Sequence, residues 1–229
     1  ITVIQAKERI NQATKTLKSI EINLSDGLNK VIAEDIISPI NMPPFDQSAM
    51  DGYALGDVAS GSYQVIGEIK AGDNPKDLTL SSGQAIRIFT GGVVPNGAIA
   101  IAQQEIVARI DDTIKLTATL VEHKNIRPKG EQILEGQLAL KKGTLITPAT
   151  IGFLYGIGIN KVTIYSAPKV AIIATGSELV SPGKELRLGQ IYESNSFALK
   201  AAIETLGVEA YIVSVEDDYD VTRDAIKEA

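Results

Sequence analysis

A chain of 229 residues with 44% apolar residues is long enough for more than one compact unit and too apolar for a disordered protein. Its net charge of −6 argues against binding to duplex nucleic acid, and its 5% aromatic content argues against base stacking with single strands. The absence of cysteine excludes disulfides and thiolate chemistry. No apolar run approaches the roughly 18 residues of a membrane span, and no signal-peptide pattern is present, so we expect a soluble cytoplasmic protein.

The first segment predicts an amphipathic helix, a strand and a second short helix. Thr2 can cap a helix on which apolar side chains recur at helical spacing up to Leu17. Apolar and polar residues then alternate over residues 20–24, as in a half-buried strand. A Ser-Asp pair after this strand favours a short helix over residues 25–32.

The central part of the chain, from Pro39 to about Gln132, predicts a separate β-rich lobe. Helical stripes are lacking there, and short β-prone runs alternate with turns rich in Gly, Pro, Asn and Asp. The strands that we expect in this lobe lie at residues 63–69, 85–89, 99–103 and 113–120.

One segment of this lobe, residues 43–54, combines two prolines, two acidic residues, a serine and an Asp-Gly pair with few bulky apolar side chains. Pro-Pro imposes extended backbone on the residue before it, and Asp-Gly tolerates a positive φ in a tight turn. Such a segment is poor core material, but it can present Ser48 and Asp51 from a fixed loop. A simple surface connection between strands is the alternative interpretation.

The last third of the chain predicts the start of a parallel α/β unit. A helix over residues 148–156 precedes a continuous apolar strand over residues 169–174, which is typical of a strand buried on both faces. A helix capped by Ser194, a strand over residues 210–215 and a helix that begins near Val221 follow.

Acidic residues follow both strands of this parallel pair. Because the carboxyl ends of parallel strands meet at one edge of a sheet, Glu178 should lie at the same edge as Asp217 and Asp218. Carboxylate oxygens are ligands that Mg²⁺ prefers, so the pattern predicts a magnesium site. Two alternatives stay open: the acidic loops only aid solubility, or one of the two adjacent aspartates does not bind the metal.

The segment Phe45-Asp46-Gln47-Ser48-Ala49-Met50-Asp51-Gly52-Tyr53-Ala54 closely resembles the signature loop of the molybdopterin molybdenumtransferases, the MoeA and gephyrin E-domain family. Three further blocks are similar to blocks of this family and occur in the family's order. They contain the runs Arg87-Ile88-Phe89-Thr90-Gly91-Gly92, Arg127-Pro128-Lys129-Gly130-Glu131 and Ala174-Thr175-Gly176-Ser177-Glu178-Leu179.

The resemblance implies a multidomain α/β plus β protein with a β-rich inserted lobe, a mixed linker domain and the start of a parallel, molybdopterin-binding-like α/β domain that is truncated. Residues 1–18 would form an N-terminal helix that packs on the α/β domain. Residues 19–37 together with 136–168 would form the linker domain. The lobe would comprise residues 38–135, and the truncated domain residues 169–229.

The resemblance also implies an activity in molybdenum cofactor biosynthesis: insertion of molybdenum from molybdate into adenylylated molybdopterin, with release of AMP and with Mg²⁺ as the divalent cation. The catalytic residues carried over are Asp51, Thr90 and Glu178, and the metal ligands are Glu178, Asp217 and Asp218. The residues carried over for substrate binding are Ser48, Gly91, Gly176, Ser177 and Asn195.

The sequence departs from the family pattern at three positions. Ser177 is a common family alternative, and only Gln132 keeps alternatives for the function open. Gln132 stands where the family usually has Asp, and Ile99 replaces another usual acid. Gln132 favours a non-catalytic scaffold or cofactor-binding paralogue, whereas the retained Asp51, Thr90 and Glu178 favour an enzyme. A tungstate-using variant is a third possibility, because no residue present separates the two oxyanions.

The resemblance further implies a homodimer in which the β-rich lobe faces the α/β domain of the other subunit. The family continues well past Ala229, with a glycine-rich turn and the basic residues that hold molybdate. We therefore expect the chain to be a fragment, and we expect residues 1–229 alone to release no AMP from adenylylated molybdopterin.

Overall fold

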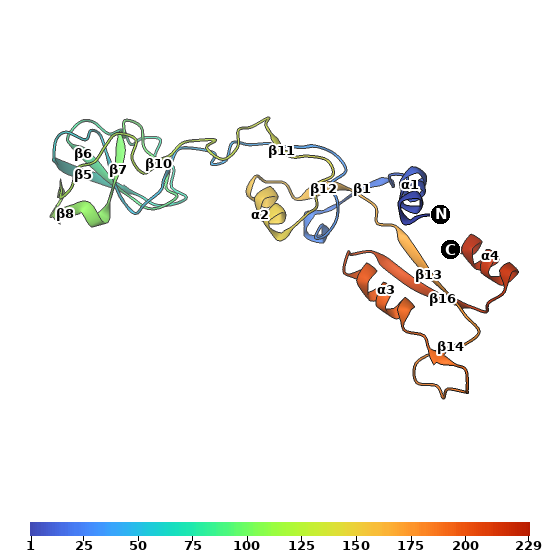
Figure 1. The fold of residues 1–229 in the computed structure, drawn as a ribbon. Helices are drawn as coiled ribbons and strands as arrows, with labels where there is room; N and C mark the ends of the chain where they lie inside the picture. The colour runs from blue at the N-terminus through green and yellow to red at the C-terminus, as the bar shows by residue number, and fades with distance from the viewer. The chain divides into compact units, whose positions relative to one another are not determined.

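The structure is a computed structural model that describes all 229 residues, and the chain forms two compact units, each considered separately (Figure 1). The first, here called the β unit, comprises Ile36–Leu140 with Gly156–Gly158. The second, here called the α/β unit, comprises Ile1–Asp35, Lys141–Tyr155 and Ile159–Ala229. The finer division into four domains stays a prediction.

The β unit is built on a six-stranded sheet with the strand order β7-β4-β6-β5-β9-β8. All neighbours in this sheet are antiparallel except β5 and β6, which run parallel. Its strands are β4 (Gly52–Leu55), β5 (Ser62–Ile69), β6 (Gln84–Ile88), β7 (Ala100–Gln103), β8 (Val107–Ile110) and β9 (Thr113–Leu116). The four strands expected from the sequence are confirmed, although the last ends at Leu116 rather than at residue 120.

Two short strand pairs and a 3-10 helix complete the β unit. The pairs are β2 (Ile36–Ile37) with β11 (Leu138–Leu140), and β3 (Gln47–Ser48) with β10 (Ile126–Arg127). The 3-10 helix η2 (Gln104–Ile106) directly follows β7. The pairing of β3 with β10 fixes the start of the segment that precedes Asp51.

Both faces of the six-stranded sheet are buried under apolar side chains. Side chains alternate along β4, so Tyr53 and Leu55 join one core cluster while Ala54 joins the cluster on the opposite face. Tyr63 of β5 belongs to the first cluster and is only 1% exposed. These two clusters make the sheet a rigid base for the loops at its ends.

Replacing Tyr63 with Phe is expected to leave the free energy of unfolding unchanged or to raise it by up to about 1 kcal/mol. The Tyr63 hydroxyl is buried and has no hydrogen-bonding partner, so its removal relieves a desolvation cost. Urea denaturation measures the effect. Tyr63→Leu is the control for size and should cost about 2 kcal/mol through lost packing; a clear loss of stability in Tyr63→Phe would contradict the expectation.

The α/β unit contains four α-helices and one 3-10 helix, and its two longest strands form a parallel pair. Its elements are α1 (Val3–Ala13), β1 (Ser19–Asn23), η1 (Leu24–Asp26), α2 (Pro148–Gly156), β12 (Lys161–Tyr165), β13 (Lys169–Thr175), β14 (Leu179–Val180), β15 (Ile191–Tyr192), α3 (Asn195–Glu204), β16 (Glu209–Val215) and α4 (Tyr219–Glu228). Strand β1 pairs antiparallel with β12, and β13 pairs parallel with β16. Helix α3 connects the parallel strands and contacts both of them. None of the helices has the length and apolar character that a membrane span needs.

The N-terminal helix predicted for this unit, with Thr2 as its cap, is confirmed. Helix α1 begins with a capping box, in which Thr2 accepts from the Gln5 backbone and the Gln5 side chain accepts from the Thr2 backbone. The helix ends at Ala13, short of Leu17. No residue of α1 is buried, and its packing on the α/β domain stays a prediction.

Two predictions for this unit are wrong. Residues 25–32 form no helix beyond η1, because Asn29 has a φ of 61° and the Ile32 N–H donates to the Thr144 carbonyl instead of to a helical turn. Strand β13 is half-buried along its length rather than fully buried. Both differences arise from long-range pairing and packing, which hydrophobic periodicity does not report.

Candidate functional site

Asp51 lies immediately before β4, where the chain enters the central sheet of the β unit. A Cβ atom on Gly52 would lie 2.0 Å from the Ala102 carbonyl oxygen of β7. Gly52 has no positive φ, so the tolerance of an Asp-Gly pair for that conformation is not used here, and glycine is needed because β7 approaches closely. This close approach fixes the backbone that carries Asp51.

The Asp51 carboxylate is held by Thr90, which is 39 residues away in the sequence. Its Oδ1 atom accepts from the Thr90 N–H at 2.8 Å and from the Thr90 hydroxyl at 3.0 Å. These bonds, and to a smaller extent the charge of Arg87, hold the pKa of Asp51 below its usual range. The second oxygen, Oδ2, has no partner in the chain, so an ionised, exposed oxygen stays available to a ligand.

Ser48 and Gly91 shape the same loop cluster. Ser48 is 1% exposed, its hydroxyl donates to the Met50 carbonyl at 2.6 Å, and its own carbonyl accepts from the Gly91 N–H at 2.8 Å. Gly91 has a φ of 81°, and a Cβ there would meet open space, so this glycine serves the turn itself. The structure thus brings together Ser48, Asp51, Thr90 and Gly91, with Ser48 turned into the loop.

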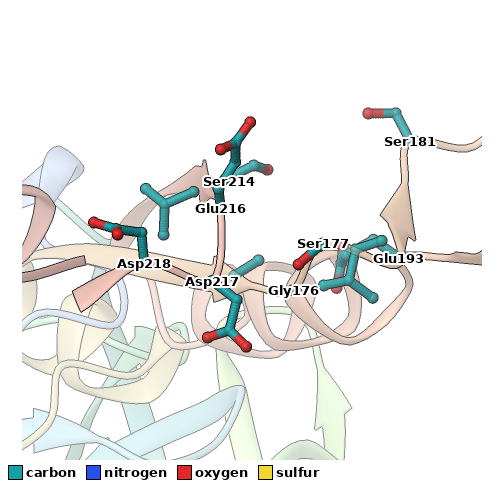
Figure 2. A pocket seen from close by; sticks show the side chains of 11 residues that line it. Gly176, Ser177, Ser181, Glu193, Ser214, Glu216, Asp217 and Asp218 are labelled. Atoms are coloured by element: carbon teal, nitrogen blue, oxygen red, sulfur yellow. The ribbon is translucent and has the colours of Figure 1, made fainter. Parts of the chain in front are cut away.

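A second group of predicted residues lies at the carboxyl edge of the parallel strands in the α/β unit. Thr175 of β13 and Val215 of β16 are partners in register, which confirms that the loops after both strands emerge at one edge. A cavity of about 410 Å³ opens there (Figure 2). It is lined by Ala174, Gly176, Ser177, Leu179, Ser181, Glu193, Ser214, Val215, Glu216, Asp217 and Asp218.

Glu178 and Asn195 do not line this cavity. The Glu178 side chain folds back across Gly176, where a Cβ would lie 2.8 Å from its Oε2 atom and 2.9 Å from Leu179 Cγ. Gly176 therefore leaves the room that the tight loop after β13 requires. Asn195 is the first residue of α3.

Glu193 is a cavity residue that the sequence reasoning missed. It is 8% exposed, and its carboxylate accepts from the backbone N–H and the hydroxyl of Ser196 in the first turn of α3. These bonds hold the pKa of Glu193 below its usual range. Ser194 occupies the N-cap position as predicted, but its side chain makes no capping bond. The sequence signal that could have revealed Glu193 is an acidic residue three positions before Ser196, at the start of a predicted helix.

The acidic residues around the cavity do not converge. Figure 2 shows the carboxylates of Glu216, Asp217 and Asp218 pointing in different directions. Asp218 is occupied as the N-cap of α4, where it accepts from the Val221 N–H at 3.0 Å. No cluster of three or more His, Asp or Glu side chains in the chain could hold a metal ion. Of the two adjacent aspartates, only Asp217 has a carboxylate without a hydrogen bond in the chain.

A β-rich unit with a Thr-held aspartate and a β-α-β unit with an acidic cavity together define a multidomain α/β plus β protein. Residues 1–158 match the family model described as MoeA N-terminal region (domain I and II). The chain belongs to this family, which confirms the resemblance noted in its motifs.

Relatives and solved structures extend this similarity over the whole chain. The molybdopterin molybdenumtransferase of Haemophilus influenzae is 39% identical over 91% of this chain and 53% of its own length. That of Staphylococcus aureus is 37% identical over 100% of this chain and 57% of its own length. The chain thus spans about half the length of these relatives.

Two crystal structures of a molybdopterin biosynthesis moeA protein from Pyrococcus horikoshii are also similar. One gives a TM-score of 0.87 at 32% identity and covers 97% of this chain and 62% of that chain. The other gives a TM-score of 0.80 at 36% identity and covers 100% of this chain and 61% of that chain. The mixed β and α/β fold class is therefore that of solved MoeA proteins.

Proposed function

We propose that the full-length protein, meaning the complete product of the gene that encodes this chain, inserts molybdenum from molybdate into adenylylated molybdopterin and releases AMP. Fold alone does not carry this proposal, since one fold can serve many functions. The observation that carries it is the Asp51–Thr90 pair, an ionised carboxylate fixed on one oxygen and free on the other. The names of the relatives support the same reaction.

Release of AMP requires cleavage of a phosphoanhydride bond, which builds negative charge on phosphate oxygens. Asp51 would orient a water molecule or a substrate hydroxyl through Oδ2, while Thr90 keeps the carboxylate ionised and in place. Gly91 sets the turn beside this pair, and Ser48 supports the loop from inside. These roles for the four residues of the β unit are part of the proposal.

A divalent cation would neutralise the phosphate charge, and the donors present are suited to Mg²⁺. This ion takes one or two carboxylates and fills its remaining positions with water and phosphate oxygens, so it needs no cluster of three acids. Asp217 offers an unshared carboxylate at the cavity, and Glu178 lies in the neighbouring loop. Asp218 is the weaker candidate because it caps α4. Gly176 and Ser177 would line the substrate cavity, with Asn195 beside it at the start of α3.

The direct test is AMP release by the purified full-length protein, supplied with adenylylated molybdopterin, Mg²⁺ and either molybdate or tungstate. We expect molybdate-dependent AMP release together with formation of the molybdenum-loaded cofactor. Tight binding of the substrate without AMP release would favour the non-catalytic paralogue, to which the neutral Gln132 points. Equal or better turnover with tungstate would favour the tungstate-using variant.

Glu178→Gln is expected to raise severalfold the Mg²⁺ concentration that half-maximal AMP release requires. The change removes one negative charge beside a cation that keeps most of its water. Glu209→Gln is the matched control, because Glu209 begins β16 at the opposite edge of the same strand pair. An unchanged Mg²⁺ titration for Glu178→Gln would refute its role in cation binding.

We further propose that the full-length protein is a cytoplasmic homodimer. The homodimer rests on what the resemblance to the MoeA family implies, namely that the β-rich lobe faces the α/β domain of the other subunit. Light scattering of the full-length protein, together with cell fractionation, provides the test. A monomer at every usable concentration would exclude the dimer.

A further inference from the structure

Arg87 occupies an unusual setting beside the Asp51 loop. It lies on β6, directly opposite Tyr53 of β4 in the antiparallel register. Its guanidinium carbon lies 5.1 Å from the centre of the Tyr53 ring and 4.7 Å from the centre of the Phe89 ring. Contacts with two aromatic rings restrict a planar cation far more than a solvated surface position does.

The guanidinium also links the backbone just after Asp51 to the side chain of Gln104 in η2. Its Nη1 donates to the Gly52 carbonyl at 3.1 Å, and its Nη2 donates to the Gln104 side-chain oxygen at 3.0 Å. The Gln104 N–H in turn donates to the Asp51 carbonyl at 3.0 Å. Arg87 therefore links the start of β4 to η2. Both linked residues are next to Asp51: Gly52 follows it in the chain, and the Gln104 N–H donates to its carbonyl.

We propose that Arg87 is a positioning residue, which holds the Asp51 backbone so that the carboxylate meets Thr90 and keeps its Oδ2 atom directed to the ligand. This inference rests on the proposed function for its effect on catalysis, but its structural content stands separately. The planar fork of arginine is essential to the role, because two donors must reach Gly52 and Gln104 from between two rings. The charge of Arg87 adds to the stabilisation of ionised Asp51.

The test compares Arg87→Gln, Arg87→Lys and the control Arg109→Gln in the full-length protein. Arg109 lies on β8 of the same sheet, pairs with Asp112 at 3.7 Å and contacts no aromatic ring, so its replacement changes the charge equally without touching the loop. Two measurements are made for each variant: amide hydrogen exchange, and kcat and KM for AMP release.

In Arg87→Gln, the N–H groups of Thr90 and Gln104 should exchange about tenfold faster or more, while amides between β5 and β9 keep their protection. The kcat should fall about tenfold to 100-fold with little change in KM, because misplacement affects the reacting groups more than substrate affinity. Arg87→Lys keeps the charge but not the fork, so it should resemble Arg87→Gln. Arg109→Gln should match the wild type in both measurements.

Two outcomes decide against the inference. Wild-type exchange of the two amides in Arg87→Gln would show that Arg87 does not hold the loop. Full recovery in Arg87→Lys would show that charge alone is required. If Arg87→Gln does not fold, Arg87→Lys alone gives the comparison. An absence of AMP release in the wild type would overturn the proposed function, whereas the exchange measurement would still decide the positioning role.

Discussion

Replacing Asp51 with Asn is expected to reduce AMP release by the full-length protein about 100-fold or more, without loss of the fold. The substitution keeps the volume of the side chain, and Asn Oδ1 can still accept from Thr90. What is lost is the negative charge and the free Oδ2 acceptor, which becomes an amide donor. Because Asp51 is exposed, little core packing depends on it. Kinetics of AMP release and a thermal melt measure the two effects.

Asp57 provides a contrasting carboxylate in the same unit. Burial opposes its ionisation, but hydrogen bonds from Ser82, Gly83 and Ser60 outweigh this effect and hold the pKa of Asp57 far below its usual range. Asp57→Asn should therefore lower the free energy of unfolding by about 2 kcal/mol while folded molecules keep their turnover.

The pH dependence gives the Asp57 contribution its own signature. Since the pKa of Asp57 is lowered by folding, its stabilisation is fully present above about pH 4 and is lost as the pH falls below that value.

The prediction for Asp51→Asn has its own contradicting outcomes. If that variant melted far below the wild type, or turned over normally, Asp51 would be structural and the assignment of its role would fail.

Local signals in the sequence were sufficient where a few neighbouring residues decide the structure. Thr2 caps the first helix as the sequence predicts, and Pro148 begins a helix as its restricted backbone favours. The helix expected over residues 25–32 failed because Ile32 pairs with Thr144, a partner more than one hundred residues away. Pairing at that distance leaves no periodic trace in either segment.

The candidate site shows the same division between local and long-range information. Topology correctly placed the loops after β13 and β16 at one edge, because a parallel crossover has that consequence for any side chains. It could not report that Asp218 would cap α4 while Asp217 stays unpaired. The choice of Asp51 and Thr90 as site residues followed only from family resemblance, and their contact was not predicted. Arg87 escaped notice because its aromatic neighbours depend on strand register.

Gly52→Ala is expected to lower the free energy of unfolding by about 3 kcal/mol, the largest stability effect that we predict for one added methyl group. The new Cβ would lie 2.0 Å from the Ala102 carbonyl oxygen, and backbone of β7 rather than a flexible side chain would have to move. Strands β4 and β7 would separate locally, and the adjacent Asp51 would lose its fixed position. Urea denaturation of the protein measures the stability change.

Gly67→Ala is the matched control for this substitution. Gly67 lies on β5 of the same sheet, has no positive φ, and has no atom within 4 Å of the position that a Cβ would take. Its replacement should leave stability unchanged or raise it by about 0.5 kcal/mol, since alanine reduces the entropy of the unfolded chain. Equal stability of the two variants would show that β7 shifts at little cost, and that close approach of the strands does not explain the glycine after Asp51.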